Sequence, residues 1–335
     1  MKDFFVANAA AALNKPITSE FVALDKQLRD RKDGRPYLCL SLIDRTGKID
    51  GRVWDDAEAL AAKFQNGDFV RVTGVVEEYN KRPNLKITSL EKISPESVDR
   101  ADFQRSTTRD VEAMWAQLRD VVDSFTDENL KALVFAFLDD PELAPRIKSA
   151  PAAKYMHHAW VGGLLEHIVD LLEFCDLAAK HFPLIHRDLL LTGAILHDIG
   201  KVYELKWDLA FDYTRQGQLV GHISIATRML DLKLRSIPGF PKRLHMLVEH
   251  MILSHHGAYE FGSPKLPMIP EAVLLHYLDN IEAKMVALRE VCQPENGIAP
   301  EWVDRVPVLN GPLLNTRVYL AGDTKRPEPP DGVLA

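Results

Sequence analysis

The segment LLLTGAILHDIGK, residues 189 to 201, decides how the second half of this chain folds. It is apolar up to Leu196 and then presents His197 and Asp198, two adjacent side chains that can bind a metal ion. The pattern predicts a buried helix over residues 187–199 whose C-terminal end brings an imidazole and a carboxylate together. A His-Asp pair on its own is common and more often marks a buried histidine beside a capping aspartate. The neighbouring segments must decide between these interpretations.

Helical periodicity extends on both sides of this segment, from Arg109 almost to the end of the chain. Residues 109–292 are therefore predicted to form an all-α domain. The many prolines that follow predict an irregular tail over residues 293–335. The individual helices are expected over residues 109–124, 127–139, 159–181, 187–199, 221–235, 241–254 and 270–291.

The first half of the chain alternates apolar and polar residues, as a half-buried strand does. Three predicted strands precede one short helix, and two more strands follow it, which is the plan of a small five-stranded OB-fold barrel. The fold class is thus multidomain: an all-β OB-fold over residues 1–95, a polar linker over 96–108 and the all-α domain. The strands are expected over residues 17–28, 37–45, 48–54, 68–79 and 84–93, with the helix over 55–64.

The formal net charge of −7 is unevenly distributed. Residues 1–95 hold 16 Lys and Arg against 14 Asp and Glu, which leaves 25 against 34 for residues 96–335. This balance disfavours a generally basic nucleic-acid binder and makes the first half the better candidate for contact with a polyanion.

Several features favour a cytoplasmic protein that does not cross a membrane. No apolar run approaches the roughly 18 residues that a membrane-spanning helix needs. The odd set of Cys39, Cys175 and Cys292 fits no zinc or disulfide pattern and suits a reducing compartment. The N-terminal segment is interrupted by Asp3 and Asn8, so we interpret it as mature protein rather than a secretion signal.

The His-Asp pair is accompanied by further polar side chains on otherwise apolar helices. A single histidine of this kind is usually a core residue, but several of them would each need a partner when buried. One shared metal site supplies that partner for all of them. Mixed imidazole and carboxylate ligands favour Mn²⁺, Fe²⁺, Co²⁺ or Zn²⁺ over Ca²⁺. The residues are His167 in GGLLEHIVDLL, His222 in GHISIA, His255 and His256 in ILSHHG, and Asp279 in LLHYLDNIEAK.

This set, H…HD…H…HH…D over separate helices, resembles the HD superfamily of metal-dependent phosphohydrolases. The resemblance implies two divalent ions, with Mn²⁺ the first candidate and Fe²⁺, Co²⁺, Zn²⁺ and Mg²⁺ as alternatives. It also implies that Asp198 bridges the two ions. By the same resemblance His167, His197, Asp198 and Asp279 hold one ion, and Asp198, His222 and either His255 or His256 hold the other.

A closer resemblance comes from the architecture and from the phrases HHAWVGGLLEHI (157–168), LLTGAILHDIGK (190–201) and HMILSHHGAYEFGSPKLP (250–267). A barrel joined to an HD domain with these phrases is similar to the YhaM-type 3′-to-5′ exoribonucleases. The resemblance alone implies exonucleolytic hydrolysis of single-stranded RNA, and of DNA as an alternative, from the 3′ end to nucleoside monophosphates.

Two other functions are left open by the residues. One is an HD phosphohydrolase of a small nucleotide or cyclic dinucleotide with a regulatory barrel, although no Gly-Tyr-Pro follows the His-Asp pair. The other is a non-catalytic single-strand-binding protein, which is disfavoured because every expected ligand position is filled. Self-association into a homo-oligomer is also left open.

Two side chains near the ligands are candidate catalytic groups. Lys201 follows Asp198 by three residues and can reach phosphate oxygens, although a lysine at a helix end is an equal alternative. His157 and His158 precede the first ligand helix. We expect one of these two, assigned to His158, to bind substrate phosphate or protonate the leaving oxygen, and the other to be structural.

The barrel offers a face for single-stranded nucleic acid. If the leucines of residues 37–45 point inward, neighbouring aromatic and basic residues point outward, where OB-folds stack bases and follow phosphates. The alternative is that Trp54 packs against the helical domain and the lysines are solvated surface. The candidate residues are Tyr37, Arg52, Trp54, Tyr79, Lys81, Arg82 and Lys86.

Overall fold

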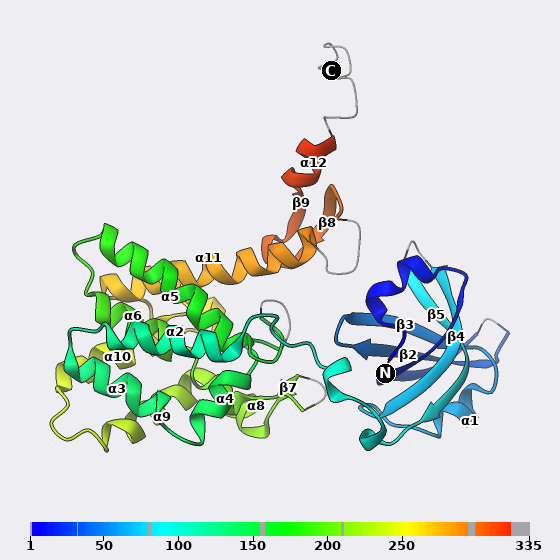
Figure 1. Ribbon diagram of the computed structural model, residues 1–335, viewed down its shortest axis with the longest axis horizontal. Coiled ribbons are helices and arrows are strands. Elements are labelled where there is room, and N and C mark those ends of the chain that lie inside the picture. The colour runs from blue at the N-terminus through cyan, green and yellow to red at the C-terminus, as the bar shows by residue number, and fades with distance from the viewer. Residues whose placement is uncertain are drawn as a thin grey trace, which may run out of the picture.

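The computed structural model describes residues 2–31, 33–79, 82–154, 158–208, 211–293 and 299–322. Figure 1 shows a β-barrel beside a helical domain, with a short connecting segment between them. The predicted multidomain class, a small barrel followed by an all-α domain, is confirmed.

The first half is a closed barrel whose strands follow the order β1, β2, β3, β5 and β4. Strands β3 and β5 run parallel, and the other neighbours are antiparallel. The helix α1 comes between β3 and β4, so the predicted order of the OB-fold is confirmed. The elements are β1 (Pro16–Asp30), β2 (Pro36–Asp44), β3 (Gly47–Val53), α1 (Ala57–Ala61), β4 (Phe69–Tyr79) and β5 (Arg82–Lys92), preceded by the 3₁₀ turns η1 (Val6–Asn8) and η2 (Ala10–Ala12).

The alternation of inward-facing and outward-facing side chains along β2 explains how the interior of the barrel is filled. Leu38, Leu40 and Leu42 are buried inside, as the period of two predicts. On the neighbouring β3, a Cβ at Gly51 would lie 2.7 Å from Ile87 Cδ1, so a larger residue would force the isoleucine side chain to shift. The leucines therefore fix which face of β2 is available to a ligand.

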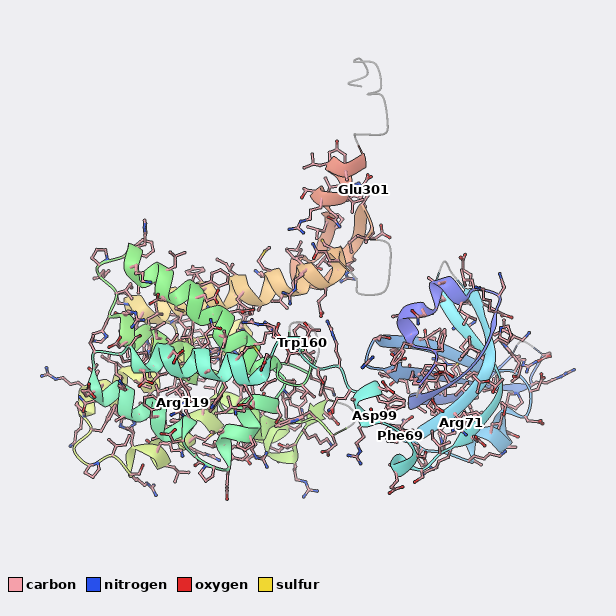
Figure 2. The ribbon with its side chains drawn as sticks, viewed as in Figure 1. Phe69, Arg71, Asp99, Arg119, Trp160 and Glu301 are labelled. Carbon is pink, nitrogen blue, oxygen red and sulfur yellow. The ribbon has the colours of Figure 1, made fainter. Side chains whose placement is uncertain are left out.

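The connecting segment contacts both domains. It contains the 3₁₀ turns η3 (Pro95–Ser97) and η4 (Arg100–Asp102). Phe103 packs edge-to-face against Phe69 of the barrel with ring centroids 5.0 Å apart. Further on, the backbone pairs with the helical domain, where Val161 N donates to Arg105 O at 2.9 Å. Figure 2 shows Phe69 and Asp99 on the barrel side of this junction, and Trp160 on the side of the helical domain that faces it.

The helical domain follows the predicted segments, and its first helices begin at capping aspartates. Asp110 and Asp127 each accept two backbone N–H groups of the helix that follows. The short helices α4, α7 and α8 were not predicted, because so few residues show no period. The elements are α2 (Val111–Asp123), α3 (Glu128–Leu138), α4 (Leu143–Ser149), α5 (Gly163–His181), α6 (Arg187–Leu196), α7 (Lys201–Glu204), β6 (Leu205–Lys206), β7 (Asp212–Tyr213), α8 (Arg215–Val220), α9 (His222–Leu234), α10 (Lys242–Ser254), η5 (Tyr259–Phe261) and α11 (Pro270–Cys292).

Helix α6 forms the centre of this domain. Every residue from Asp188 to Leu196 is buried, and the helix packs against α3, α5, α10 and α11. A helix that is apolar on all sides must be enclosed by others, which is why this segment decides the fold. The C-terminal end of α6 places His197 and Asp198 in the interior of the domain. Among the described residues, no helix combines the length and apolar character that crossing a bilayer requires.

The prediction of an irregular tail was wrong for residues 299–322. They form a hairpin of β8 (Trp302–Val306) and β9 (Gly311–Leu314), joined by η6 (Pro307–Leu309) and followed by α12 (Thr316–Gly322). Figure 1 shows this unit projecting from the end of α11. Pro312 is tolerated within β9 because an edge strand does not need every backbone N–H.

Candidate metal centre

The carboxylate of Asp198 lies between two sets of imidazoles. Its Oδ2 is 3.3 Å from His197 Nε2 and 3.9 Å from His167 Nε2. Its Oδ1 is 3.3 Å from His222 Nε2 and 3.7 Å from His255 Nε2. The two oxygens of one buried carboxylate therefore face different sets of donor atoms.

The first group consists of His167, His197 and Asp279. These residues come from α5, the end of α6 and α11. His167 Nε2 lies 3.3 Å from His197 Nε2 and 3.3 Å from Asp279 Oδ1. All three donor atoms lie within 4.8 Å of one another, which is compact enough for one ion.

The second group consists of His222, His255 and His256. His222 opens α9, and the other two follow α10 directly. One nitrogen from each imidazole lies within 4.8 Å of the others. The sequence left open which of His255 and His256 is the ligand, and the structure brings both into the group.

Each of the five imidazoles is held at Nδ1 by a partner outside the two groups. A carbonyl or carboxylate oxygen accepts at this position, which leaves Nε2 to point at the shared space. Side chains that only filled a core would not need to share one orientation. The Nδ1 partners are Glu282 for His167 at 2.7 Å, Ala194 O for His197 at 2.9 Å, Glu204 for His222 at 3.1 Å, Ile252 O for His255 at 2.8 Å and Phe261 O for His256 at 2.8 Å.

The second group contains buried atoms that need a partner. Within the described residues, Asp198 Oδ1, His222 Nε2 and His255 Nε2 are buried and accept or donate no hydrogen bond. A buried polar atom without a partner is costly, and a divalent cation would satisfy all three at once. The donor set therefore fits a divalent metal.

The electrostatics of the buried groups also favour a cation. Burial lowers the pKa of His255 well below its usual range, so this imidazole is a neutral ligand near pH 7. Burial works against ionisation of Asp198, but Lys201 and the neighbouring imidazoles hold the pKa of its carboxyl well below its usual range. Burial also disfavours a charged His167, yet hydrogen bonds with Asp279 and Glu282 raise its pKa to about 10. A metal ion would take the place of that proton.

Glu282 and His158 form a second layer behind His167. Glu282 joins the two imidazoles, with Oε2 2.7 Å from His167 Nδ1 and Oε1 2.6 Å from His158 Nε2. All three side chains are buried. His158 was expected to contact substrate, and the structure places it where it can orient Glu282. Glu282 itself was not predicted from the sequence. The available signal was its position three residues after Asp279, on the same side of α11.

Two glycines let the ligand segments approach each other. A Cβ at Gly200 would lie 2.1 Å from His222 O, so the run HDIGK needs glycine for the start of α9 to pack against it. Gly257 has a φ of +77° and would place a Cβ 2.2 Å from the His276 ring. Because His276 also donates to His255 O at 2.9 Å, this glycine helps to hold the second group.

Lys201 lies inside the cluster rather than on the surface. Its ammonium pairs with Asp198 Oδ2, and only 12% of its side chain is exposed. It begins the short helix α7 instead of ending a longer one, so the macrodipole does not explain it. The paired ammonium is a positive charge beside the buried carboxylate of Asp198.

The candidate nucleic-acid residues of the barrel form two contacts between aromatic and basic side chains. Tyr37 and Trp54 stack with ring centroids 4.9 Å apart and an interplanar angle of 13°. The Arg52 guanidinium lies 3.8 Å from the centre of the Tyr79 ring. Trp54 therefore packs on its own barrel, with the Arg31 guanidinium also 5.1 Å from the centre of its ring.

The remaining basic candidates are less well placed or lie outside the described part. Lys86 is exposed and pairs with Glu77 at 3.7 Å. Lys81 and His157 lie outside the described residues, and only the backbone of Arg82 is described, as the first residue of β5.

Comparisons with known proteins agree with both domains. Residues 24–93 match the OB-fold nucleic acid binding domain family, and residues 164–284 match the HD domain family. The second match contains every residue of the two groups.

The chain also has similar relatives over about three quarters of its length. The 3′-5′ exoribonuclease YhaM of Bacillus subtilis (strain 168) is 34% identical over 254 residues, covering 76% of this chain and 80% of the relative. The protein of the same name from Halalkalibacterium halodurans is 35% identical over 254 residues, covering 76% and 78%. The second OB-fold domain of replication protein A from Methanococcus maripaludis aligns at 28% identity with a TM-score of 0.20, covering 25% of this chain and 86% of that structure.

Proposed function

Because the chain belongs to the family of YhaM-type 3′–5′ exoribonucleases, we propose that it shortens single-stranded RNA from the 3′ end. Each step would release one nucleoside monophosphate. The observation that carries this proposal is the buried carboxylate of Asp198, whose two oxygens face two sets of metal-binding nitrogens. The two alternatives, a small-molecule phosphohydrolase and a non-catalytic binding protein, are not favoured by this family membership.

The hydrolytic step joins a water oxygen to the terminal phosphorus and breaks its bond to the 3′ oxygen of the preceding nucleotide. One of the two water protons goes to that leaving oxygen, and the other stays on the new phosphate until solvent takes it up. Bound divalent ions polarise the phosphoryl oxygens and activate water in sites of this kind. The ammonium of Lys201 adds fixed positive charge beside the same oxygens as negative charge develops. Glu282 keeps His167 oriented throughout.

We propose that the site holds two ions, with Mn²⁺ as the first candidate. His167, His197, Asp198 and Asp279 would hold one ion. Asp198, His222 and one or both of His255 and His256 would hold the other. The compact distances within each group and the shared carboxylate support this partition. Metal analysis of the purified protein, with the ratio of ions to chains, tests the number and the identity together.

The barrel would guide the single strand towards this centre. The Tyr37 and Trp54 stack and the Arg52 and Tyr79 pair supply flat rings and positive charge, which bind bases and phosphates without reading sequence. Lys81, Arg82 and Lys86 remain predicted contacts. We treat residues 1–95 as the proposed binding unit and residues 109–292 as the proposed catalytic unit.

We further propose that the protein acts in the cytoplasm, which its three free thiols support. Fractionation of cells that produce the protein tests this location. Self-association stays a prediction, and light scattering of the purified chain measures it directly.

The activity is tested with one RNA oligonucleotide labelled separately at each end. With Mn²⁺ present, a 5′ label should yield a ladder of shortening products, whereas a 3′ label should appear at once as a mononucleotide. A DNA strand of the same sequence measures the sugar preference, and a chelator should stop both reactions. Early release of the 5′ label as a mononucleotide would contradict the proposed direction. Intact oligonucleotides beside a hydrolysed cyclic dinucleotide would support the small-molecule alternative.

A further inference from the structure

Two aromatic side chains stand exposed immediately after the second group of histidines. The turn η5 (Tyr259–Phe261) follows His255 and His256 in the chain. Tyr259 is 64% exposed and Phe261 is 60% exposed. Exposed aromatic rings forgo the favourable free energy of burial that such residues usually gain in a domain of this size.

The turn is held in place by hydrogen bonds rather than left loose. Phe261 O accepts from His256 Nδ1 at 2.8 Å, which ties the turn to a metal-facing imidazole. Ser263 Oγ donates to Lys265 O at 2.6 Å and lies 3.2 Å from Leu253 O, the last but one residue of α10. Farther along, Met268 N donates to His250 Nε2 at 3.0 Å. The two exposed rings are therefore carried by a backbone that hydrogen bonds hold in place.

The turn that carries these rings lies next to the metal centre. A single imidazole, that of His256, separates the Phe261 backbone from the space shared by the second group. The exposed Lys265 adds a positive charge on the same loop. Aromatic rings with a nearby cation are the elements that hold single-stranded nucleic acid, because every base has a flat face for stacking.

We propose that Tyr259 and Phe261 form a stacking platform for the nucleobase at the 3′ end of the single strand. This inference rests on the proposed function. The platform would hold the terminal nucleotide so that its phosphate reaches the metal centre, and it would accept any of the four bases. The barrel then binds the strand at a distance, and the platform positions the nucleotide that is removed.

The test combines two substrates with two proteins. The substrates are single-stranded RNAs that differ only at the 3′-terminal nucleotide, which carries adenine in one and no base in the other. The wild-type protein should remove the terminal adenosine roughly tenfold more efficiently than the abasic nucleotide, as expected for one stacked base. The Tyr259→Ala, Phe261→Ala double variant should remove both equally, at the rate of the wild type on the abasic strand.

Two further variants keep this result interpretable. Tyr277→Ala removes a ring that is 61% exposed on α11, and it should discriminate between the substrates as the wild type does. If the double variant folds poorly, the Tyr259→Leu, Phe261→Leu pair and the Tyr259→Trp, Phe261→Trp pair compare aliphatic with aromatic side chains at both positions. Only the aromatic pair should retain discrimination.

Each outcome separates the platform from the function on which it rests. Equal removal of both strands by the wild type would overturn the platform and leave the exonuclease intact. Discrimination that survives in the double variant would also overturn it, and a lower mass of that variant in light scattering would assign the surface to a second copy of the chain. If the wild type shortens neither strand, the proposed function fails, and tighter binding of the adenosine-ended strand by the wild type alone would still support the platform.

Discussion

The barrel and the helical domain place their functional side chains in different environments. In the barrel, Tyr37 and Trp54 stack on the outer face of the strands, and Arg52 lies over the half-exposed Tyr79. In the helical domain, the imidazoles and carboxylates meet in the interior, where His167, His197 and His255 are almost fully buried. A surface of stacked rings can bind many sequences but contributes little to the cleavage of a phosphodiester bond. A desolvated cluster can concentrate charge on one phosphate but cannot hold a long strand.

This contrast predicts that the two domains can be impaired separately. Changes in the cluster should affect the hydrolysis of every phosphodiester, large or small. Changes on the barrel should affect only substrates long enough to reach it. A minimal phosphodiester without bases and an RNA oligonucleotide are therefore the two substrates that distinguish them.

Asp198→Ala should have the largest effect, because it removes the only carboxylate that faces both groups among the described residues. Hydrolysis of both substrates should fall by more than about 10³-fold, which exceeds the loss of a single electrostatic donor. The bound metal should fall as well. Asp140→Ala removes a carboxylate that pairs with Lys233, at the opposite end of α9 from His222, and it should change neither quantity. Full activity with unchanged metal content in Asp198→Ala would reject the assignment of the centre.

Lys201→Ala should lower turnover while metal remains bound. The lost ammonium acts mainly as charge develops on the phosphate, so kcat on both substrates should fall by roughly 100-fold. Metal content measured beside the rate separates this role from ligand support. Unchanged turnover would show that Lys201 serves only to neutralise Asp198 in the folded protein.

Glu282→Gln should lower the metal affinity of the first group without removing any of its candidate ligands. The hydrogen bonds of Glu282 hold both His167 and His158, and loss of such a support usually lowers metal affinity about 10- to 100-fold. Titration of the metal-free protein measures this affinity. Glu166→Gln is the matched control, since Glu166 is also buried but bonds to Trp160 instead of a ligand. Equal metal affinity in the two variants would count against the positioning role.

Trp54→Ala should have the smallest effect, and only on the oligonucleotide. Loss of one stacking partner should reduce the affinity for single-stranded RNA roughly tenfold, with the minimal phosphodiester hydrolysed as before. Arg71→Ala is a suitable control, because this exposed arginine pairs with Glu20 and Glu91 on the barrel surface, where Figure 2 labels it. A loss of activity on both substrates in Trp54→Ala would break the separation between the domains.

Much of this organisation could be predicted from the residues themselves. The order of strands and the buried helix before His197 follow from local periodicity, because a period of two or of 3.6 residues is a property of neighbours in the chain. The residues that the structure gathers into the two groups could also be predicted, because polar side chains on apolar helices are unusual. Their assembly at Asp198 is a long-range fact, and the sequence could suggest it only through the family resemblance.

The features that escaped prediction depend on contacts between distant segments. Glu282 resembles any other helical glutamate until the structure places it between His158 and His167. The exposure of Tyr259 and Phe261 could not be predicted, since aromatic residues are more often buried. The hairpin of β8 and β9 was hidden by prolines, whose restriction of the backbone does not forbid an edge strand.

Helix α11 contributes Asp279 to the first group and Glu282 to its support, and it is the last helix of the catalytic domain. During synthesis on the ribosome this helix emerges after every other ligand has already been made. A nascent chain therefore cannot complete its first group before α11 has emerged from the ribosome.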